Sequence, residues 1–187
     1  MEELQLIEGL KAGNQFAYRV LVDTYQRPIR NLCMGMVLEE TIAEELAQDV
    51  FIEVFKSIHA FRQDSKLSTW MYRMAVNKSL NFIRSQKKHK VLRSIESFLF
   101  QEDDKIYFQV EDKKMLNPLN KLIQDEEEIK INKSLQSLPE NQRIAFTLHK
   151  FDDFSYKEIS EIMNLSLSSV ESLIHRAKTN LKKRLLD

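Results

Sequence analysis

Glycine, proline and cysteine are scarce in this chain of 187 residues, which has three glycines, three prolines and one cysteine. So few turn-forming residues argue against a protein of many β-hairpins, and the abundant Leu, Ile, Lys and Glu tolerate helices well. The single cysteine, Cys33, excludes a disulfide within the chain, and its apolar neighbours indicate a small buried side chain rather than a reactive thiol. The sequence therefore predicts an all-α protein.

Signals for catalysis and for a membrane are missing as well. The four histidines are scattered without metal-ligand spacing, and three glycines leave no glycine-rich phosphate loop. We therefore expect no enzyme activity, no catalytic residue, no metal and no cofactor. The N-terminus lacks the features of a signal peptide, and no apolar run approaches the roughly 18 residues of a membrane span. We expect a cytoplasmic protein without stable membrane insertion.

The net charge of zero conceals blocks of opposite sign. Residues 39–53 contain six acidic side chains and no basic one, whereas residues 62–90 contain eight basic side chains and one acidic. Residues 176–184 contain five basic side chains and no acidic one. Ordinary surfaces mix both signs, so these blocks predict separate surfaces for separate partners, including nucleic acid.

Apolar spacing predicts three helices in the first half of the chain. The clearest stripe alternates spacings of three and one and leaves the acidic side chains of 44–53 off its face. Its members are Ala43, Leu46, Ala47, Val50, Phe51, Val54, Phe55 and Ile58. The stripe before it contains Phe16, Val20, Leu21, Tyr25, Ile29 and Leu32, and the one after it contains Trp70, Met74, Val76, Leu80 and Ile83. We expect a helical domain over residues 1–90, its helices ending near residue 88.

Residues 91–129 are predicted to be a linker. Helical periodicity fades there and acidic residues cluster at 101–104 and 125–128. Apolar side chains at 98–100 and 106–108 indicate that part of the linker docks on a domain or a partner.

Residues 130–187 have the spacing of a helix-turn-helix. Pro139 suits the first turn of a helix, and Ser155 with Glu158 forms a capping-box pattern at the start of the next one. Asn164 is the turn residue, and the inner face of the last helix is predicted to be Val170, Ile174, Ala177 and Leu181. The outer face is then free to enter a major groove. By itself this pattern also fits a helical hairpin whose basic end only complements the helix dipole.

The basic segment at 62–90 adds a second nucleic-acid signal. Its cations are interleaved with Trp70, Tyr72 and Phe82 and stand beside a polar loop at 62–68. Cations with stacking aromatics are typical of surfaces that bind single-stranded nucleic acid.

Two blocks of the sequence resemble RNA polymerase sigma factors of the extracytoplasmic-function (ECF, group IV) kind. Residues 43–55 and 61–77 are similar to sigma region two, and residues 138–143 and 155–163 are similar to sigma region four. The resemblance covers about residues 10–88 and 130–185 in the family's order. It implies two small helical domains, a region-two helical bundle and a region-four helix-turn-helix, joined by a flexible linker.

The resemblance assigns roles within region two. The acidic helix corresponds to the one that binds the clamp helices of the polymerase β′ subunit, and the next segment to the one that opens and reads the minus-ten element. The implied core polymerase contacts are Glu45, Gln48, Asp49 and Glu53. The implied minus-ten contacts are Gln63, Asp64, Ser65, Lys66, Ser68, Arg73, Asn77, Lys78 and Arg84, with a flipped base held by the loop. Trp70 stands where primary sigma factors wedge a tryptophan into melting duplex, but we expect it to be a core residue.

Region four implies a second DNA surface, for the minus-thirty-five duplex. The implied contacts are Ser168, Ser169, Glu171, Ser172, His175, Arg176 and Lys178. Relatives often carry a base at the positions of Glu171 and Leu173, so duplex binding is expected to depend on Arg176 and the basic tail at 182–184, with strong salt dependence. Glu171 can instead accept a hydrogen bond from a cytosine amino group.

We therefore expect a sigma factor that binds core polymerase through the β′ clamp, directs it to specific promoters in duplex and single-stranded form, and responds to an anti-sigma factor. One alternative is a helix-turn-helix regulator of duplex operators, with residues 1–90 as a sensory or dimerisation domain; another is a helical adaptor. The acidic face beside a basic segment favours the sigma factor, because a dimerising regulator has no use for that pair.

Overall fold

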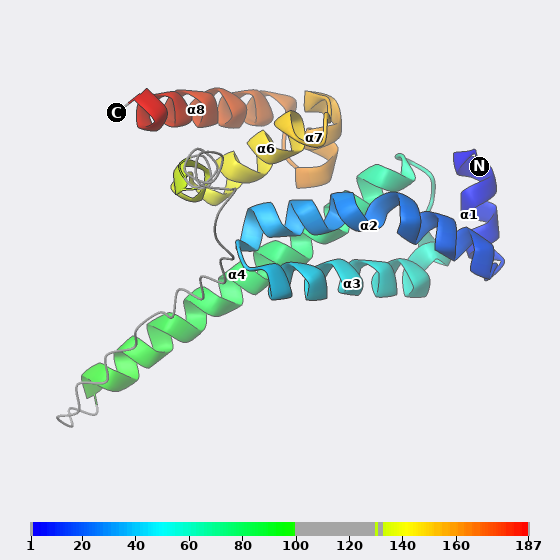
Figure 1. Cartoon of the computed structure of the whole chain (residues 1–187), viewed down its shortest axis with the longest axis horizontal. Coiled ribbons are helices and arrows are strands. Elements are labelled where there is room, and N and C mark those ends of the chain that lie inside the picture. The colour runs from blue at the N-terminus through cyan, green and yellow to red at the C-terminus, as the bar shows by residue number, and fades with distance from the viewer. Residues whose placement is uncertain (1, 100–129, 131–132, 187) are drawn as a thin grey trace, which may run out of the picture.

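The computed structural model describes residues 2–99, 130 and 133–186 of the chain, and every regular element in those residues is a helix (Figure 1). The elements are α1 (Glu3–Lys11), α2 (Gln15–Val37), α3 (Glu40–Ser57), the 3₁₀ turn η1 (Ile58–Ala60), α4 (Leu67–Leu99), α6 (Glu140–Lys150), α7 (Tyr156–Met163) and α8 (Leu167–Leu186). The all-α prediction is confirmed. None of these helices combines the length and the apolar character that crossing a membrane requires.

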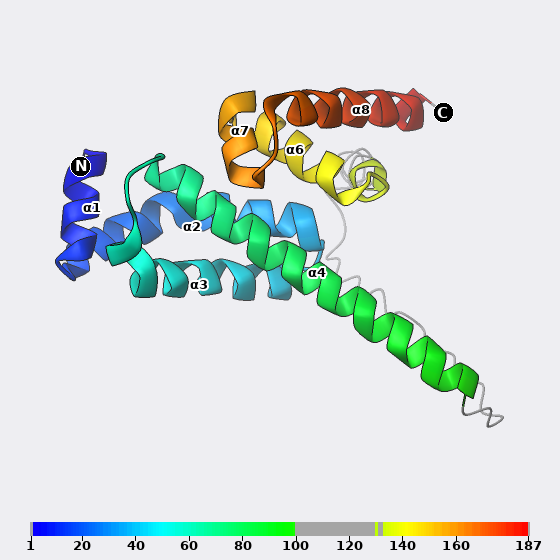
Figure 2. The ribbon, with the colours of Figure 1, turned by 180° about the vertical axis from the view of Figure 1, so that it is seen from behind.

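The N-terminal bundle is built on α2, α3 and α4. Helices α2 and α3 lie side by side, and α4 crosses behind them, as the reverse view shows (Figures 1 and 2). The side chain of Asn14 caps α2 by accepting a hydrogen bond from the Phe16 N–H at 2.8 Å. Leu38 ends α2 in the left-handed conformation, with φ of 64°, so the chain turns back into α3 almost at once.

Helix α4 is longer than the sequence pattern predicts. It continues to Leu99, beyond the expected end near residue 88 and into the segment predicted as a linker. Figure 2 shows its second half running past the ends of α2 and α3. Residues 89–99 contain no glycine or proline, and their apolar residues recur at spacings of one and three, so the sequence there also fits a helix.

The C-terminal bundle has the predicted helix-turn-helix. Ser155 and Glu158 form both hydrogen bonds of the capping box at the start of α7, and Asn164 ends α7 in the left-handed conformation with φ of 53°. The predicted inner face of α8, from Val170 to Leu181, is buried. Pro139 precedes α6 as its N-cap rather than standing in its first turn.

Two residues of the predicted apolar stripes are exposed in the structure. Phe16 and Phe55, both assigned to buried stripes, are each 62% exposed. Each stands near an end of its predicted stripe, where coverage by other helices is partial; the Phe55 ring has its centroid 5.1 Å from that of Tyr18. Trp70 is half-buried and stacks on Phe61 with ring centroids 4.9 Å apart, which agrees with the predicted core role. Cys33 is buried, and burial raises the pKa of its thiol to about 11.

One continuous apolar core joins the two bundles. Buried side chains of α2 and α4, such as Met36 and Val76, belong to the same cluster as Leu148, Ile159 and Ile162 of the C-terminal bundle. Helix α7 packs on α4 and α6 packs on α2. The relative position of the two bundles is therefore fixed by packed side chains as well as by the chain connection.

Candidate polymerase and nucleic-acid interfaces

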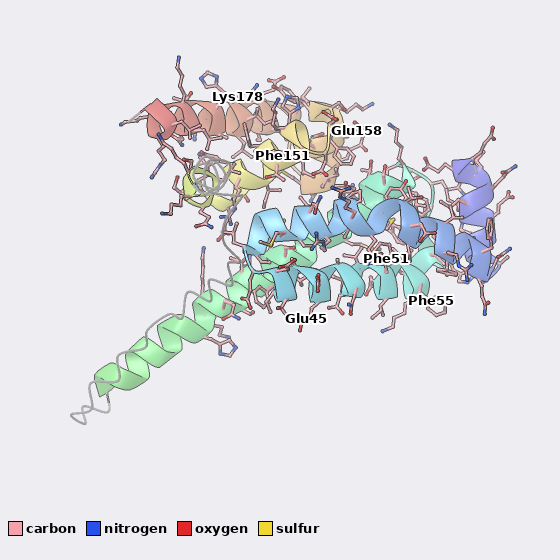
Figure 3. All side chains as sticks on the ribbon, in the orientation of Figure 1. Glu45, Phe51, Phe55, Phe151, Glu158 and Lys178 are labelled. Atoms are coloured by element: carbon pink, nitrogen blue, oxygen red, sulfur yellow. The ribbon has the colours of Figure 1, made fainter. Side chains whose placement is uncertain are left out.

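The acidic face of α3 is available to a partner. Glu45, Gln48 and Asp49 are exposed, and Glu53 is half-buried with its carboxylate 3.9 Å from the Lys78 ammonium. The acidic residues of this face recur at intervals of four, which places them in one row along the helix. Figure 3 shows Glu45 and Phe55 along the outer edge of α3.

Two exposed apolar side chains on the same helix were not predicted from the sequence as contacts with a partner. Ile52 is 50% exposed and Phe55 is 62% exposed, and a groove of about 510 Å³ runs between α2 and α3 beside them. The groove is lined by Val22, Gln26, Arg30, Glu44, Ala47, Gln48, Phe51 and Ile52. The signal was present in the sequence, because Ile52 follows Gln48 by four positions and Phe55 follows Ile52 by three.

The predicted minus-ten loop joins η1 to α4. Gln63 adopts the left-handed conformation with φ of 62°, Gln63 and Asp64 are exposed, and Ser65 is half-buried. The Glu3 carboxylate accepts a hydrogen bond from the Leu67 N–H at 2.6 Å, which anchors the end of the loop to α1. The loop therefore holds its polar groups in place, as the binding of an unpaired nucleotide base requires.

The predicted minus-ten residues that lie on α4 differ in exposure and in the neighbours they face. Arg73, Asn77 and Arg84 recur at spacings of four and seven and so share one side of α4. Asn77 and Arg84 are exposed, Ser68 is half-buried, and Lys78 points toward Glu53 instead. The structure therefore places Lys78 in an ion pair with the α3 face, although the sequence grouped it with the DNA contacts.

Two of the predicted minus-ten cations contact the C-terminal bundle. The Lys66 ammonium lies 2.7 Å from the Glu158 carboxylate, and the Arg73 Nε–H donates to the Glu161 carbonyl at 2.9 Å. Between them, the Tyr72 hydroxyl donates to Asp152 at 3.0 Å. We call these three pairs the α4–α7 contact. Sequence reasoning missed it, because its partners lie about 80 to 90 positions apart.

The ionisation of the acids in the α4–α7 contact follows from their surroundings. Hydrogen bonds from Lys66 and Ser155 lower the pKa of Glu158 to about 2. Burial raises the pKa of Asp152 to about 6, although the hydrogen bond from Tyr72 acts in the opposite direction. Burial and the neighbouring Asp152 carboxylate raise the pKa of Tyr72.

The predicted minus-thirty-five set is brought together on α8. All seven residues, Ser168, Ser169, Glu171, Ser172, His175, Arg176 and Lys178, are exposed. The hydroxyl of Ser166 accepts a hydrogen bond from the Ser169 N–H at 3.2 Å, which caps the first turn of the helix. Figure 3 shows Lys178 on the outer side of α8, away from the edge of α3 that carries Glu45.

A groove beside α8 adds residues that the sequence did not assign. It has a volume of about 390 Å³ and is lined by Asn141, Leu165, Ser168, Ser169, Ser172, Leu173 and Arg176. Asn141 belongs to the first turn of α6, so two helices supply polar groups to the groove. The spacing of α8 alone could not have identified it.

Arg143 is a second contact between bundles that sequence reasoning missed. It lies on α6, is only 7% exposed, and donates from Nη2 to the Met36 carbonyl at 2.9 Å. That carbonyl is in the last turn of α2, where a cation is favoured by the helix dipole. Burial lowers the pKa of Arg143 from its ordinary value.

Comparisons with known proteins identify both bundles. Residues 21–89 match Sigma-70 region 2, and residues 129–181 match Sigma-70, region 4. The chain is 31% identical to the RNA polymerase sigma-H factor of Pseudomonas aeruginosa, over 98% of this chain and 94% of that protein. It is also 31% identical to the ECF RNA polymerase sigma-E factor of Escherichia coli K12, over 92% of this chain and 88% of that protein.

Solved structures share the fold. CnrH, in complex with the cytosolic domain of CnrY, aligns with a TM-score of 0.69 and 19% identity, over 98% of this chain and 96% of CnrH. The sigma factor RpoE of Bartonella quintana, in complex with the anti-sigma factor NepR, aligns with a TM-score of 0.64 and 21% identity, over 90% of this chain and 96% of RpoE.

The two sigma regions occur in the expected order, and the relatives match over nearly their whole length. This decides against the operator-binding regulator and the helical adaptor. The chain belongs to the ECF sigma factor family and is an RNA polymerase sigma factor for promoter-directed transcription initiation.

Proposed function

We propose that this chain is a group IV sigma factor whose three separate surfaces take three separate partners. The acidic face of α3 binds the β′ clamp, the loop at 63–68 with the exposed side of α4 captures unpaired minus-ten bases, and the outer face of α8 reads the minus-thirty-five duplex. The observation that carries the proposal is the segregation of charge, with six acids and no base at 39–53 beside a basic segment at 62–90.

The polymerase surface has both features of a protein interface. Exposed acidic residues attract a basic partner, and the side chains of Ile52 and Phe55 supply apolar surface that becomes buried when the partner binds. The groove between α2 and α3 accepts a side chain of the partner next to them. The proposed contacts are Glu45, Gln48, Asp49, Ile52, Glu53 and Phe55.

The minus-ten surface combines fixed polar groups with cations. Asn77 is exposed and carries both a donor and an acceptor, which suits the edge of an unpaired base. Arg73 and Arg84 stand on the same side of α4 and supply charge for the backbone phosphates. Gln63, Asp64 and Ser65 lie in the loop beside them.

The minus-thirty-five surface is a short recognition helix with a cationic continuation. Ser168, Ser169 and Ser172 are small donors near the helix start, and Arg176 and Lys178 follow within reach of phosphates or guanine. The negative charge of Glu171 disfavours contact with a DNA phosphate at that position. Duplex affinity therefore depends on few base contacts and strongly on salt.

The protein works by binding and performs no covalent chemistry. Its partners, core polymerase and promoter DNA, are cytoplasmic in bacteria, so we place the protein there. An anti-sigma factor that engages both bundles is the proposed regulator; the related fold of Bartonella quintana RpoE was solved with the anti-sigma factor NepR.

The polymerase surface is tested by charge reversal. We expect Glu45→Lys with Asp49→Lys to weaken binding to core polymerase by about tenfold or more, because like charges then face each other across the interface. The matched control is Glu2→Lys with Glu8→Lys, which makes the same change in charge at two exposed positions near the N-terminus. Titration of labelled protein with purified core gives both dissociation constants. Parent-like binding by the α3 variant would show that this helix is not the polymerase contact.

A further inference from the structure

We infer that helix α1 sets the shape of the loop at 62–66, and that Glu3 and Lys11 are positioning residues for base recognition. The inference rests on the proposed function, in which this loop holds an unpaired minus-ten base. It goes beyond that proposal because neither residue belongs to the proposed DNA contacts. Both act through the loop, and they determine how well the loop distinguishes one base from another.

The two ends of the loop are held by the same helix. At its start, the Lys11 ammonium donates a hydrogen bond to the Phe61 carbonyl at 3.2 Å. At its end, the Glu3 carboxylate accepts one from the Leu67 N–H at 2.6 Å. We call these two hydrogen bonds the α1 anchor. Figures 1 and 2 show α1 at the end of the bundle where η1 leads into α4.

The Glu3 carboxylate caps α4 from a distant part of the chain. Leu67 is the first residue of α4, and the first N–H groups of a helix have no carbonyl partner within it. A Ser, Thr, Asp or Asn just before a helix usually supplies an acceptor, but the residue before α4 is Lys66, whose side chain only donates. A carboxylate suits this position, because the helix dipole favours negative charge there.

Helix α1 is a fixed support for these hydrogen bonds. Its residues Leu6, Ile7 and Leu10 are buried in the apolar core, and the helix packs on η1 as well as on α2. The backbone groups that it holds belong to residues that are themselves buried, since Phe61 is 5% exposed and Leu67 is 0% exposed. The α1 anchor therefore joins two packed parts of the bundle and differs from an ion pair between mobile surface side chains.

The loop between these ends needs such support. Gln63 has φ of 62°, in the left-handed region that a residue other than glycine seldom adopts. Gln63 and Asp64 are exposed and Ser65 is half-buried, so packing around these side chains contributes little. The Phe61 ring stacks on the Trp70 ring with centroids 4.9 Å apart and joins the two ends of the loop to each other. The shape of the loop is therefore set at its ends, where α1 acts.

Base discrimination depends on this shape more than overall strand affinity does. Hydrogen bonds to the edge of a base weaken steeply when the donor or acceptor shifts or tilts. The attraction between a cation such as Arg84 and the phosphates carries no sequence information and tolerates small shifts. A loop released at one end still lies beside the strand, but Gln63 and Asp64 then sample several arrangements. Loss of the α1 anchor should therefore make the four bases more nearly equal.

The test measures binding of single-stranded DNA by holoenzyme that carries Glu3→Ala or Lys11→Met. The probes are four versions of the minus-ten segment of a promoter that the parent holoenzyme selects from a random library. They differ only at the base whose replacement costs the parent most affinity. We expect the affinity ratio between the best and the worst base to fall about fivefold in each variant. Affinity for the worst base should change by less than about twofold.

Three further variants separate positioning from stability. Glu8→Ala removes an exposed acid from the same helix and should keep the parent ratio. Glu3→Gln keeps an acceptor and Lys11→Arg keeps a donor, so each should restore most of the ratio. A general loss of stability lowers the active fraction for all four probes alike and leaves the ratio unchanged. Circular dichroism at the assay temperature checks that each variant is folded.

Hydrogen exchange of the free protein detects the α1 anchor directly. In the parent the Leu67 N–H is held by Glu3, so its exchange requires that this hydrogen bond opens. We expect the amides of residues 62–67 to exchange about tenfold faster in Glu3→Ala and at the parent rate in Glu8→Ala. Amides in the middle of α2 are the internal reference.

An unchanged affinity ratio in both Glu3→Ala and Lys11→Met would overturn the inference, as would unchanged exchange of the loop in Glu3→Ala. Failure of the proposed function has a different signature, seen in the triple variant Gln63→Ala, Asp64→Ala, Ser65→Ala. If this variant keeps the parent ratio, the loop does not read the base and both assignments are wrong. If it loses the ratio while the two α1 variants keep it, the loop reads the base and only the role of α1 is wrong.

Discussion

The two surfaces proposed to read DNA are exposed to different degrees. On α8 all seven predicted contacts face outward, and the opposite side of the helix is buried through Val170, Ile174 and Ala177. In the predicted minus-ten set, Lys66 just before α4 and Arg73 on it are engaged by α7, and Lys78 pairs with Glu53. The C-terminal bundle therefore leaves the proposed minus-thirty-five surface exposed and contacts part of the proposed minus-ten surface.

The physical origin of this difference is the number of neighbours around each helix. Helix α8 packs on α6 and α7 along one face, which leaves the rest to solvent. Helix α4 packs on α2 and α3 along one side and on α7 along another. A helix that is packed on two sides has little surface left for solvent, so some of its polar side chains contact the other bundle.

The largest effect on this comparison is expected from Arg143→Ala. The substitution removes the buried donor to the Met36 carbonyl and the packing of a long side chain between the bundles. We expect the free energy of unfolding to fall by about 2 kcal/mol, measured by urea titration with circular dichroism.

Arg30→Ala is the control for that measurement. Arg30 pairs with Glu40 at 3.1 Å and with Glu44 at 3.6 Å, but these acids are 73% and 53% exposed. Its loss should change stability by less than about 0.5 kcal/mol. Equal losses in the two variants would show that Arg143 has no special role between the bundles.

A smaller effect on the free energy of unfolding is expected from a change of pH. The folded-state pKa of Asp152 is raised to about 6 from an ordinary value of 3.8, so the folded chain binds this proton more tightly than the unfolded chain. Its contribution to the free energy of unfolding is therefore most favourable below about pH 4 and declines as the pH rises to about 6. Glu158, with its pKa lowered to about 2 from 4.5, acts oppositely and loses its contribution only below about pH 4.5.

Asp152→Asn isolates the first of these effects. The difference in unfolding free energy between the parent and this variant should vary between about pH 4 and 6 and be constant from about pH 7 to 8. Urea titrations at each pH give that difference. A difference that is constant over the whole range would mean that Asp152 has an ordinary pKa in the folded chain.

Sequence reasoning could predict the features that depend on near neighbours. Helical spacing gave the buried inner face of α8, and the capping box at Ser155 and Glu158 is formed as the pattern predicts. The apolar stripe of 43–58 left the acidic side chains off its face, and Glu44, Glu45 and Asp49 are exposed. These features depend on positions three or four apart, where the geometry of a helix is sufficient.

Features that depend on distant parts of the chain could not be predicted. Nothing in the pattern around Arg73 indicates that it meets Glu161, and nothing around Arg143 indicates Met36. Phe55 follows the apolar period of α3, and its ring centroid lies 5.1 Å from that of Tyr18 on α2, yet the residue is 62% exposed. Glu158 serves its local capping box and also pairs with Lys66, so a local motif concealed a contact between bundles.

The most direct test of separate DNA surfaces is a crossed measurement with the holoenzyme and two DNA probes. Asn77→Ala and Arg176→Ala are each assayed on the single-stranded minus-ten segment and on the minus-thirty-five duplex. We expect Asn77→Ala to weaken strand binding about tenfold without affecting the duplex, and Arg176→Ala to weaken duplex binding by a similar factor, with a shallower salt dependence, without affecting the strand. Equal losses on both probes for either variant would contradict the division of DNA reading between α4 and α8.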